Sequence, residues 1–148
     1  MGCDIHAFIE QQSNGSSRWR MIPDDIFDCR HYGLFGWLAD VRNYSVVPPI
    51  SQPRGLPLNA SRGIRREFES WGIDAHSESW PSADELLEFD YDAEFEDRRG
   101  EWWQPADPGS GEMTTYRDFL GSGYFDDLET LRGLRQLRPT RVVFWFDN

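Results

Sequence analysis

The stretch Gly2-Cys3-Asp4-Ile5-His6-Ala7-Phe8-Ile9-Glu10 decides how the central sheet is expected to form. Its side chains alternate, so that Cys3, Ile5, Ala7 and Ile9 share one face and Asp4, His6, Phe8 and Glu10 share the other. A period of two is typical of a β-strand with one buried face. Because Asp4 and His6 are two residues apart, their side chains leave this strand on the same side.

The rest of the chain supplies partners for this strand. A turn at residues 13–17 followed by apolar and basic residues at 18–22 predicts a hairpin. Residues 140–146 are apolar on both faces, which is typical of a central strand that is covered on both sides. Helical spacing predicts helices near residues 29–42, 60–71, 83–87 and 124–137.

These elements predict an α+β fold in one domain over residues 1–148. The sheet is expected to be mixed or antiparallel, with the first strand and the last strand near its centre and two or three helices packed on it. We expect residues 3–9 and 141–146 to be neighbours in this sheet.

Composition and charge limit the function. The chain is 39% hydrophobic and 15% aromatic, which is a globular composition, and it carries a formal net charge of −11. This charge repels nucleic acid and anionic membrane, so we expect no direct DNA or RNA binding and no membrane partner. The chain has only two cysteines and no long apolar run, which favours a reducing cytoplasm.

Two Asp-x-His pairs, Asp4/His6 and Asp74/His76, are the sharpest chemical feature of the sequence. Carboxylate and imidazole ligate Zn²⁺ or Mn²⁺, a carboxylate also suits Mg²⁺, and a histidine oriented by a carboxylate can act as a general base. We predict that the two pairs converge on one divalent metal, with His6, His76 and Asp74 as catalytic residues. The alternative is that each pair is structural. His31, which has no acidic neighbour close by, is expected to be structural.

A proline-rich loop between the predicted helices carries the candidate ligand-binding residues. Arg42-Asn43 and Arg54-Gly55 flank it, and an arginine in a rigid loop can clamp phosphate or carboxylate with its planar fork. The alternative is that each arginine ties down its own loop. Ser77 and Ser79 add hydroxyl groups next to His76.

Two further features have simple structural interpretations. Residues 87–97 alternate apolar and acidic side chains, which predicts an edge strand with a solvated charged face. Trp102 and Trp103 could stack on a base, but adjacent aromatic residues are more often part of a core, and the core is the interpretation favoured here.

The sequence resembles a family of small proteins encoded by bacteriophages and bacterial genomes, largely without assigned function. The resemblance is carried by Met1-Gly2-Cys3-Asp4-Ile5-His6, Tyr32 to Asn43, Ser51-Gln52-Pro53-Arg54-Gly55-Leu56-Pro57, Asp74-Ala75-His76-Ser77-Glu78-Ser79-Trp80 and Val143-Phe144-Trp145-Phe146-Asp147-Asn148. The family's polar positions correspond to Asp4, His6, Arg42, Asn43, Arg54, Asp74, His76, Ser77 and Ser79. Where the family often has another histidine, this chain has Glu78, which can also ligate a metal.

The resemblance implies an accessory protein of phage type in the cytoplasm of a bacterial host cell, and countering a host defence is one role that such proteins have. The leading hypothesis is that it binds a small, phosphate-bearing, nucleotide-like ligand and hydrolyses it with help from a divalent metal (Zn, Mn or Mg). The alternatives are a non-catalytic, homo-oligomeric sponge that sequesters a nucleotide signal, and an acidic decoy that binds a host protein.

Overall fold

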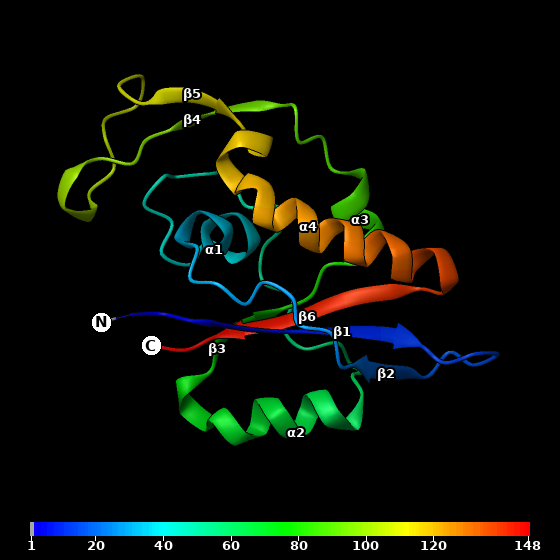
Figure 1. The fold of residues 1–148 in the computed structure, drawn as a ribbon. Helices are drawn as coiled ribbons and strands as arrows, with labels where there is room; N and C mark the ends of the chain where they lie inside the picture. The colour runs from blue at the N-terminus through cyan, green and yellow to red at the C-terminus, as the bar shows by residue number, and fades with distance from the viewer. Residues whose placement is uncertain (1) are drawn as a thin grey trace. The chain divides into compact units, whose positions relative to one another are not determined.

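The computed structural model describes residues 2–148, so Met1 of the family-like opening lies outside the described residues. Its main sheet has four antiparallel strands in the order β2-β1-β6-β3. These strands are β1 (Ile5–Gln12), β2 (Trp19–Ile22), β3 (His76–Ser79) and β6 (Thr140–Phe146). The α+β class and the central positions of the first and last strands, β1 and β6, are therefore confirmed (Figure 1).

The strand pairing explains why β6 is apolar throughout. Ile5 of β1 lies opposite Phe146, and Gln11 lies opposite Thr140, so the two strands pair along almost their full length. On its other side β6 pairs with β3. All seven residues of β6 are buried, because this strand has a neighbour on each edge and helices on each face.

Helices α2 (Arg62–Trp71) and α3 (Ala83–Glu88) pack on the main sheet, together with the part of α4 (Tyr116–Leu137) that follows Phe125. On one face, Ile64 of α2 forms a core cluster with Val143 and Trp145 of β6. On the other face, α3 contacts β6, and the side-chain amide nitrogen of Gln11 donates to the carbonyl of Leu134 in α4. Figure 1 shows α2 on one side of the sheet, and α3 with the C-terminal half of α4 on the other.

Local signals set the helix ends. The Ser61 hydroxyl accepts from the backbone N–H of Ile64 at the start of α2, and this helix ends at Gly72, whose φ is 56°. Ser82 and Glu85 form a reciprocal capping box at the start of α3. Helix α3 continues to Glu88. The strand predicted for residues 87–97 is therefore shorter than expected, and only Glu94–Asp97 forms a strand, β4.

Two compact units are distinguished in the chain. The unit called here the sheet unit comprises Met1–Arg30, Pro53–Phe89 and Asp126–Asn148. The hairpin unit comprises His31–Gln52 and Asp90–Phe125. It contains α1 (Tyr32–Ala39), the 3-10 turn η2 (Glu101–Trp103) and the two-stranded sheet of β4 and β5 (Glu112–Thr115). The single domain expected over residues 1–148 stays a prediction.

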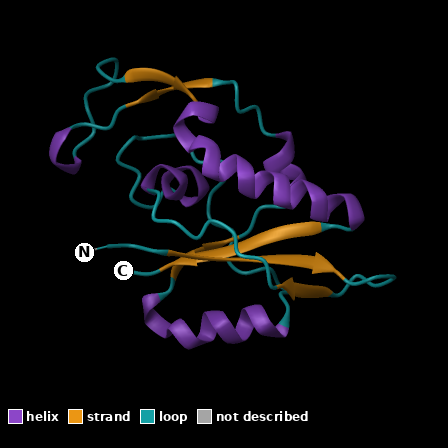
Figure 2. Cartoon of the chain, in the orientation of Figure 1, coloured by secondary structure: helices purple, strands orange, loops and turns teal. Residues whose placement is uncertain are grey.

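The remaining predicted elements are shifted at their ends. Helix α1 is shorter than expected. His31 caps its start, where the Nδ1 atom of the ring accepts from the backbone N–H of Leu34, and Asp40, in the left-handed region, caps its end. Helix α4 starts at Tyr116 rather than Tyr124 and continues through a kink at Gly121, whose φ is 81°. The long loop of residues 40–61 is confirmed and is drawn in teal in Figure 2. No helix among residues 2–148 is long and apolar enough to cross a bilayer.

Candidate ligand-binding site

The first Asp-x-His pair is tied to two different partners. The Asp4 carboxylate accepts from Nε and Nη2 of Arg30 at 2.8 Å each, and this hydrogen bonding lowers the pKa of Asp4. Nε2 of His6 lies 2.9 Å from Oδ2 of Asp147, and the imidazole packs 4.0 Å from the ring of Trp71. Asp4 and His6 therefore each have a local structural partner.

The second pair lies elsewhere. His76 starts β3, its Nδ1 is 3.0 Å from the Ser77 hydroxyl, and its ring stacks on Phe146 at 6.1 Å. Asp74 is exposed at the end of the 3-10 turn η1 (Gly72–Asp74). The sequence predicted no strand around His76, and the structure pairs His76 with Phe146 of β6.

The predicted convergence of the two pairs is wrong. His6 lies opposite Trp145 and His76 lies opposite Phe146, and these two neighbours in β6 point to opposite faces of the sheet. A shared site of Asp4, His6, Asp74 and His76 is therefore not formed. Among residues 2–148, no group of three or more His, Cys, Asp or Glu side chains is placed to hold a metal ion. The expectation of a divalent metal stays a prediction.

Arg42 and Asn43 lie in the hairpin unit. The Asn43 side chain donates to Asp40 at 2.7 Å and to the Val47 carbonyl at 2.8 Å, and its oxygen accepts from the Val47 backbone at 3.0 Å. Nη1 of Arg42 donates to the Tyr44 hydroxyl at 3.2 Å. These bonds hold the loop after α1, which is the structural alternative, and the ligand-binding role of the two residues stays a prediction.

Arg54 lies at the edge of a pocket in the sheet unit, but its guanidinium group is already paired with a carboxylate. Both Nη atoms bind the Glu85 carboxylate, and Nη1 also donates to the Trp80 carbonyl at 2.8 Å. The bond to Arg54 lowers the pKa of Glu85 to about 2, and the same bond raises the pKa of Arg54. Ser79 is buried and accepts from the Arg54 backbone N–H at 2.9 Å, so it positions the loop rather than a ligand.

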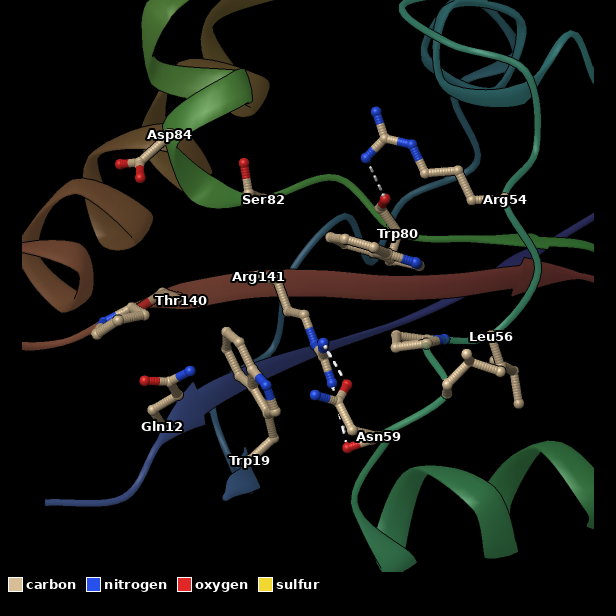
Figure 3. Close-up of a pocket in the computed structure, with 13 residues that line it drawn as sticks. Gln12, Trp19, Arg54, Leu56, Asn59, Trp80, Ser82, Asp84, Thr140 and Arg141 are labelled. Carbon is tan, nitrogen blue, oxygen red and sulfur yellow. Dashed lines mark hydrogen bonds between the residues drawn. The ribbon is translucent and has the colours of Figure 1, made fainter. Parts of the chain in front are cut away.

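The pocket has a volume of about 840 Å³. Strands, the 53–59 loop and the start of α3 line it, and all of its lining residues belong to the sheet unit (Figure 3). The lining is formed by Gln12, Trp19, Arg54, Leu56, Pro57, Leu58, Asn59, Trp80, Ser82, Asp84, Pro139, Thr140 and Arg141.

Arg141 is the organising side chain of this pocket. Its Nε donates to Oε1 of Glu10 at 2.8 Å, and its Nη1 donates to Oδ1 of Asn59 at 3.0 Å. The side chains of Arg141 and Glu10 are only 4% and 0% exposed. Oε2 of Glu10 accepts from the Ser61 backbone at 2.7 Å, which links the ion pair to the start of α2. Burial lowers the pKa of Arg141 and the bond to Glu10 opposes that effect.

Two tryptophans flank the buried guanidinium. It lies 3.9 Å from the ring centroid of Trp19 and 5.5 Å from that of Trp80, within the distance range of cation–π contacts. The guanidinium of Arg54 lies 5.2 Å from the Trp80 ring. Figure 3 shows Trp19 and Trp80 on either side of Arg141, with Asn59 beside it. The pocket therefore offers aromatic surface held in place by buried charge.

Comparison with protein-family models, with curated proteins and with solved structures found no match.

Four residues of the pocket and its ion pair were not predicted as functional from the sequence: Arg141, Glu10, Trp19 and Trp80. A signal for two of them was present: Arg141 is a lone charge at the start of an apolar strand, and an antiparallel pairing of the first and last strands can place it opposite Glu10. Trp19 and Trp80 carry no motif. They come together only in the folded sheet, where Trp19 of β2 and Trp80, just after β3, both approach Arg141 of β6.

Proposed function

We propose that this protein is an accessory protein of phage type that binds a small, phosphate-bearing, nucleotide-like ligand in the pocket of Trp19 and Trp80. The observation that carries the proposal is the pair of indole rings held around a buried guanidinium. Stacking of a base on an aromatic ring contributes about 1–3 kcal/mol and needs no particular base. Trp19 is only partly buried, so indole surface remains available to a planar ligand.

The size and the polar lining of the pocket support a small molecule. A volume of about 840 Å³ lies within the usual range of small-molecule sites, roughly 300–1,000 Å³. Gln12, Asn59, Ser82 and Thr140 provide amide and hydroxyl groups at the wall. Such groups fix the orientation of a ligand, while the apolar side chains around them supply most of the contact area.

The ion pairs in the pocket limit how much electrostatic attraction can contribute to ligand binding. Arg141 is paired with Glu10, and Arg54 is paired with Glu85, so neither guanidinium is an open clamp for phosphate. The Arg54 side chain is 30% exposed, and a phosphate would share it with Glu85 at the rim. Stacking rather than charge should therefore provide most of the binding free energy, and the salt dependence should be weak.

The proposal is limited to binding and favours the sponge over the hydrolase. The residues expected to hydrolyse the ligand, His6, His76 and Asp74, do not line the pocket. Sequestration requires only the pocket, whereas the expected metal-assisted hydrolysis requires ligands that the sheet places on two different faces.

Isothermal titration calorimetry tests this function. Purines and pyrimidines are titrated as base, nucleoside, monophosphate and diphosphate, with inorganic phosphate as a reference. We expect nucleotides to bind and Trp19→Ala to weaken binding by about 10- to 100-fold. The matched control is Trp102→Ala, because Trp102 is 87% exposed and belongs to the hairpin unit. No binding by any base-containing compound, or equal losses in the two variants, would contradict the proposal.

A further inference from the structure

The hairpin unit exposes two adjacent tryptophans. Trp102 and Trp103 are 87% and 62% exposed, and both have left-handed backbone, with φ of 54° and 64°. Trp103 packs against Tyr44 with ring centroids 5.0 Å apart. Together with Arg99 and Gly100, the two tryptophans line a hollow of about 380 Å³. We call these four residues the tryptophan patch.

The backbone of the tryptophan patch has an energetically unfavourable conformation. Positive φ is unfavourable for a bulky residue, and here it occurs at two successive positions without glycine. The core position expected for Trp102 and Trp103 is wrong, because the core of the hairpin unit is formed by other side chains, including Phe95 and Tyr116 at a ring distance of 4.7 Å. Large exposed aromatic residues on strained backbone indicate a surface that is used in binding.

Composition indicates the kind of contact. Tryptophan, tyrosine and arginine are the residues most enriched among those that dominate protein–protein binding energy. The hollow between the indole rings and Arg99 is large enough to receive an apolar side chain. Because Arg99 lines this hollow, an apolar side chain is a better occupant of it than a cation.

The net charge of the segment that carries the patch indicates the charge of the partner. Residues 90–125 contain nine Asp or Glu residues and three Arg residues. Glu94, Glu101, Asp107 and Glu112 are all exposed. The whole chain carries −11, so a second copy and a nucleic acid would both be repelled, whereas a basic surface would be attracted.

We propose that the tryptophan patch is a docking site for a basic protein segment that also carries apolar side chains. An apolar side chain of the partner enters the hollow, while its lysines or arginines contact the indole faces and are attracted by the exposed carboxylates of residues 90–125. This site lies in the hairpin unit and is independent of the nucleotide pocket, so either proposal can fail without the other.

The test uses a ten-residue peptide of alternating Arg and Leu, with an alternating Glu and Leu peptide as the charge control. Binding to the full chain is measured by fluorescence anisotropy of the labelled peptide. The double variant W102A/W103A keeps every charge and should lose about 30-fold or more in affinity. The double variant W102F/W103F should stay within a few-fold of the unaltered protein, and Trp19→Ala should have no effect. Circular dichroism confirms that each variant is folded.

Three results would overturn the proposal. The first is no binding of the Arg-Leu peptide to the unaltered protein. The second is a loss of less than about threefold in W102A/W103A, which would mean that net charge alone attracts the peptide. The third is a single-stranded oligonucleotide that binds the patch more tightly than the peptide, which would make stacking on bases its role.

Discussion

Replacing Arg141 by Met should strongly destabilise the sheet unit, because Glu10 would then be buried without its cation. Arg141 and Glu10 are 4% and 0% exposed, and the guanidinium also donates to Asn59 and lies on Trp19. Removing one partner of a buried ion pair costs about 3–5 kcal/mol. The cation–π contact alone is estimated at about 2 kcal/mol when it is desolvated.

The double-mutant cycle of Arg141→Met with Glu10→Gln isolates the pair. Glu10→Gln removes the buried charge and keeps a carbonyl oxygen for the Ser61 N–H, so the double variant should lose less than the sum of the single variants. We expect a coupling free energy of about 2–3 kcal/mol. Urea unfolding is followed by far-ultraviolet circular dichroism, because tryptophan fluorescence responds to the loss of the guanidinium itself.

Arg135→Met is the matched control for this cycle. Arg135 pairs with Asp84 at 2.7 Å, but the two side chains are 39% and 51% exposed, so the loss should be below about 1 kcal/mol. If Arg141→Met also cost less than about 1 kcal/mol, or if the two single losses were additive, the buried pair would not organise the pocket and the reasoning would be refuted.

Three further predictions address the rest of the sheet unit. The pKa of Glu85 is about 2 in the folded protein, against an ordinary 4.5, so its bond to Arg54 contributes fully above about pH 4.5 and is lost as the pH falls towards 2. Because both side chains are 30–40% exposed, this contribution to the free energy of unfolding is about 1 kcal/mol. Glu85→Gln should therefore flatten the acid limb of a curve of stability against pH, and an unchanged limb would disprove this contribution. Because His6 and His76 lie on opposite faces, the unfolding free energies lost in their alanine variants should add within about 0.5 kcal/mol, and a larger coupling would show that they share a site. Deleting residues 143–148 removes most of the central strand β6, so the truncated chain should show no cooperative thermal transition by calorimetry, and a transition at the original temperature would contradict the topology.

Much of the fold could be predicted because its signals are local. Alternation in residues 2–10 and the apolar run of β6 identify a sheet with two central strands, and Ser61 and Ser82 mark helix starts. The ends of α1 and α4 could not be predicted, since a left-handed Asp40 stops one helix and a kink at Gly121 lets the other continue. These outcomes depend on the packing of each helix rather than on its own sequence.

The site was less predictable because it depends on register. The spacing of an Asp-x-His pair shows that the two side chains share a face of their own strand, but the pairing with β6 decides which face of the sheet that is. Likewise, no local signal shows that Arg54 would meet Glu85, which lies 31 residues away. Arg141 and Glu10 are 131 residues apart, and only the antiparallel register of the two end strands brings them together.

The most direct test of the proposed pocket is the response of the tryptophan indole N–H signals in ¹H–¹⁵N correlation spectra as nucleotides are added. The chain has seven tryptophans, and single Trp→Phe variants assign their signals. A nucleotide in the pocket should shift the signals of Trp19 and Trp80 most, and leave those of Trp102 and Trp103 unchanged. If no nucleotide shifts Trp19 or Trp80, or if the shifts are confined to Trp102 and Trp103, the pocket of Trp19 and Trp80 is not a nucleotide site.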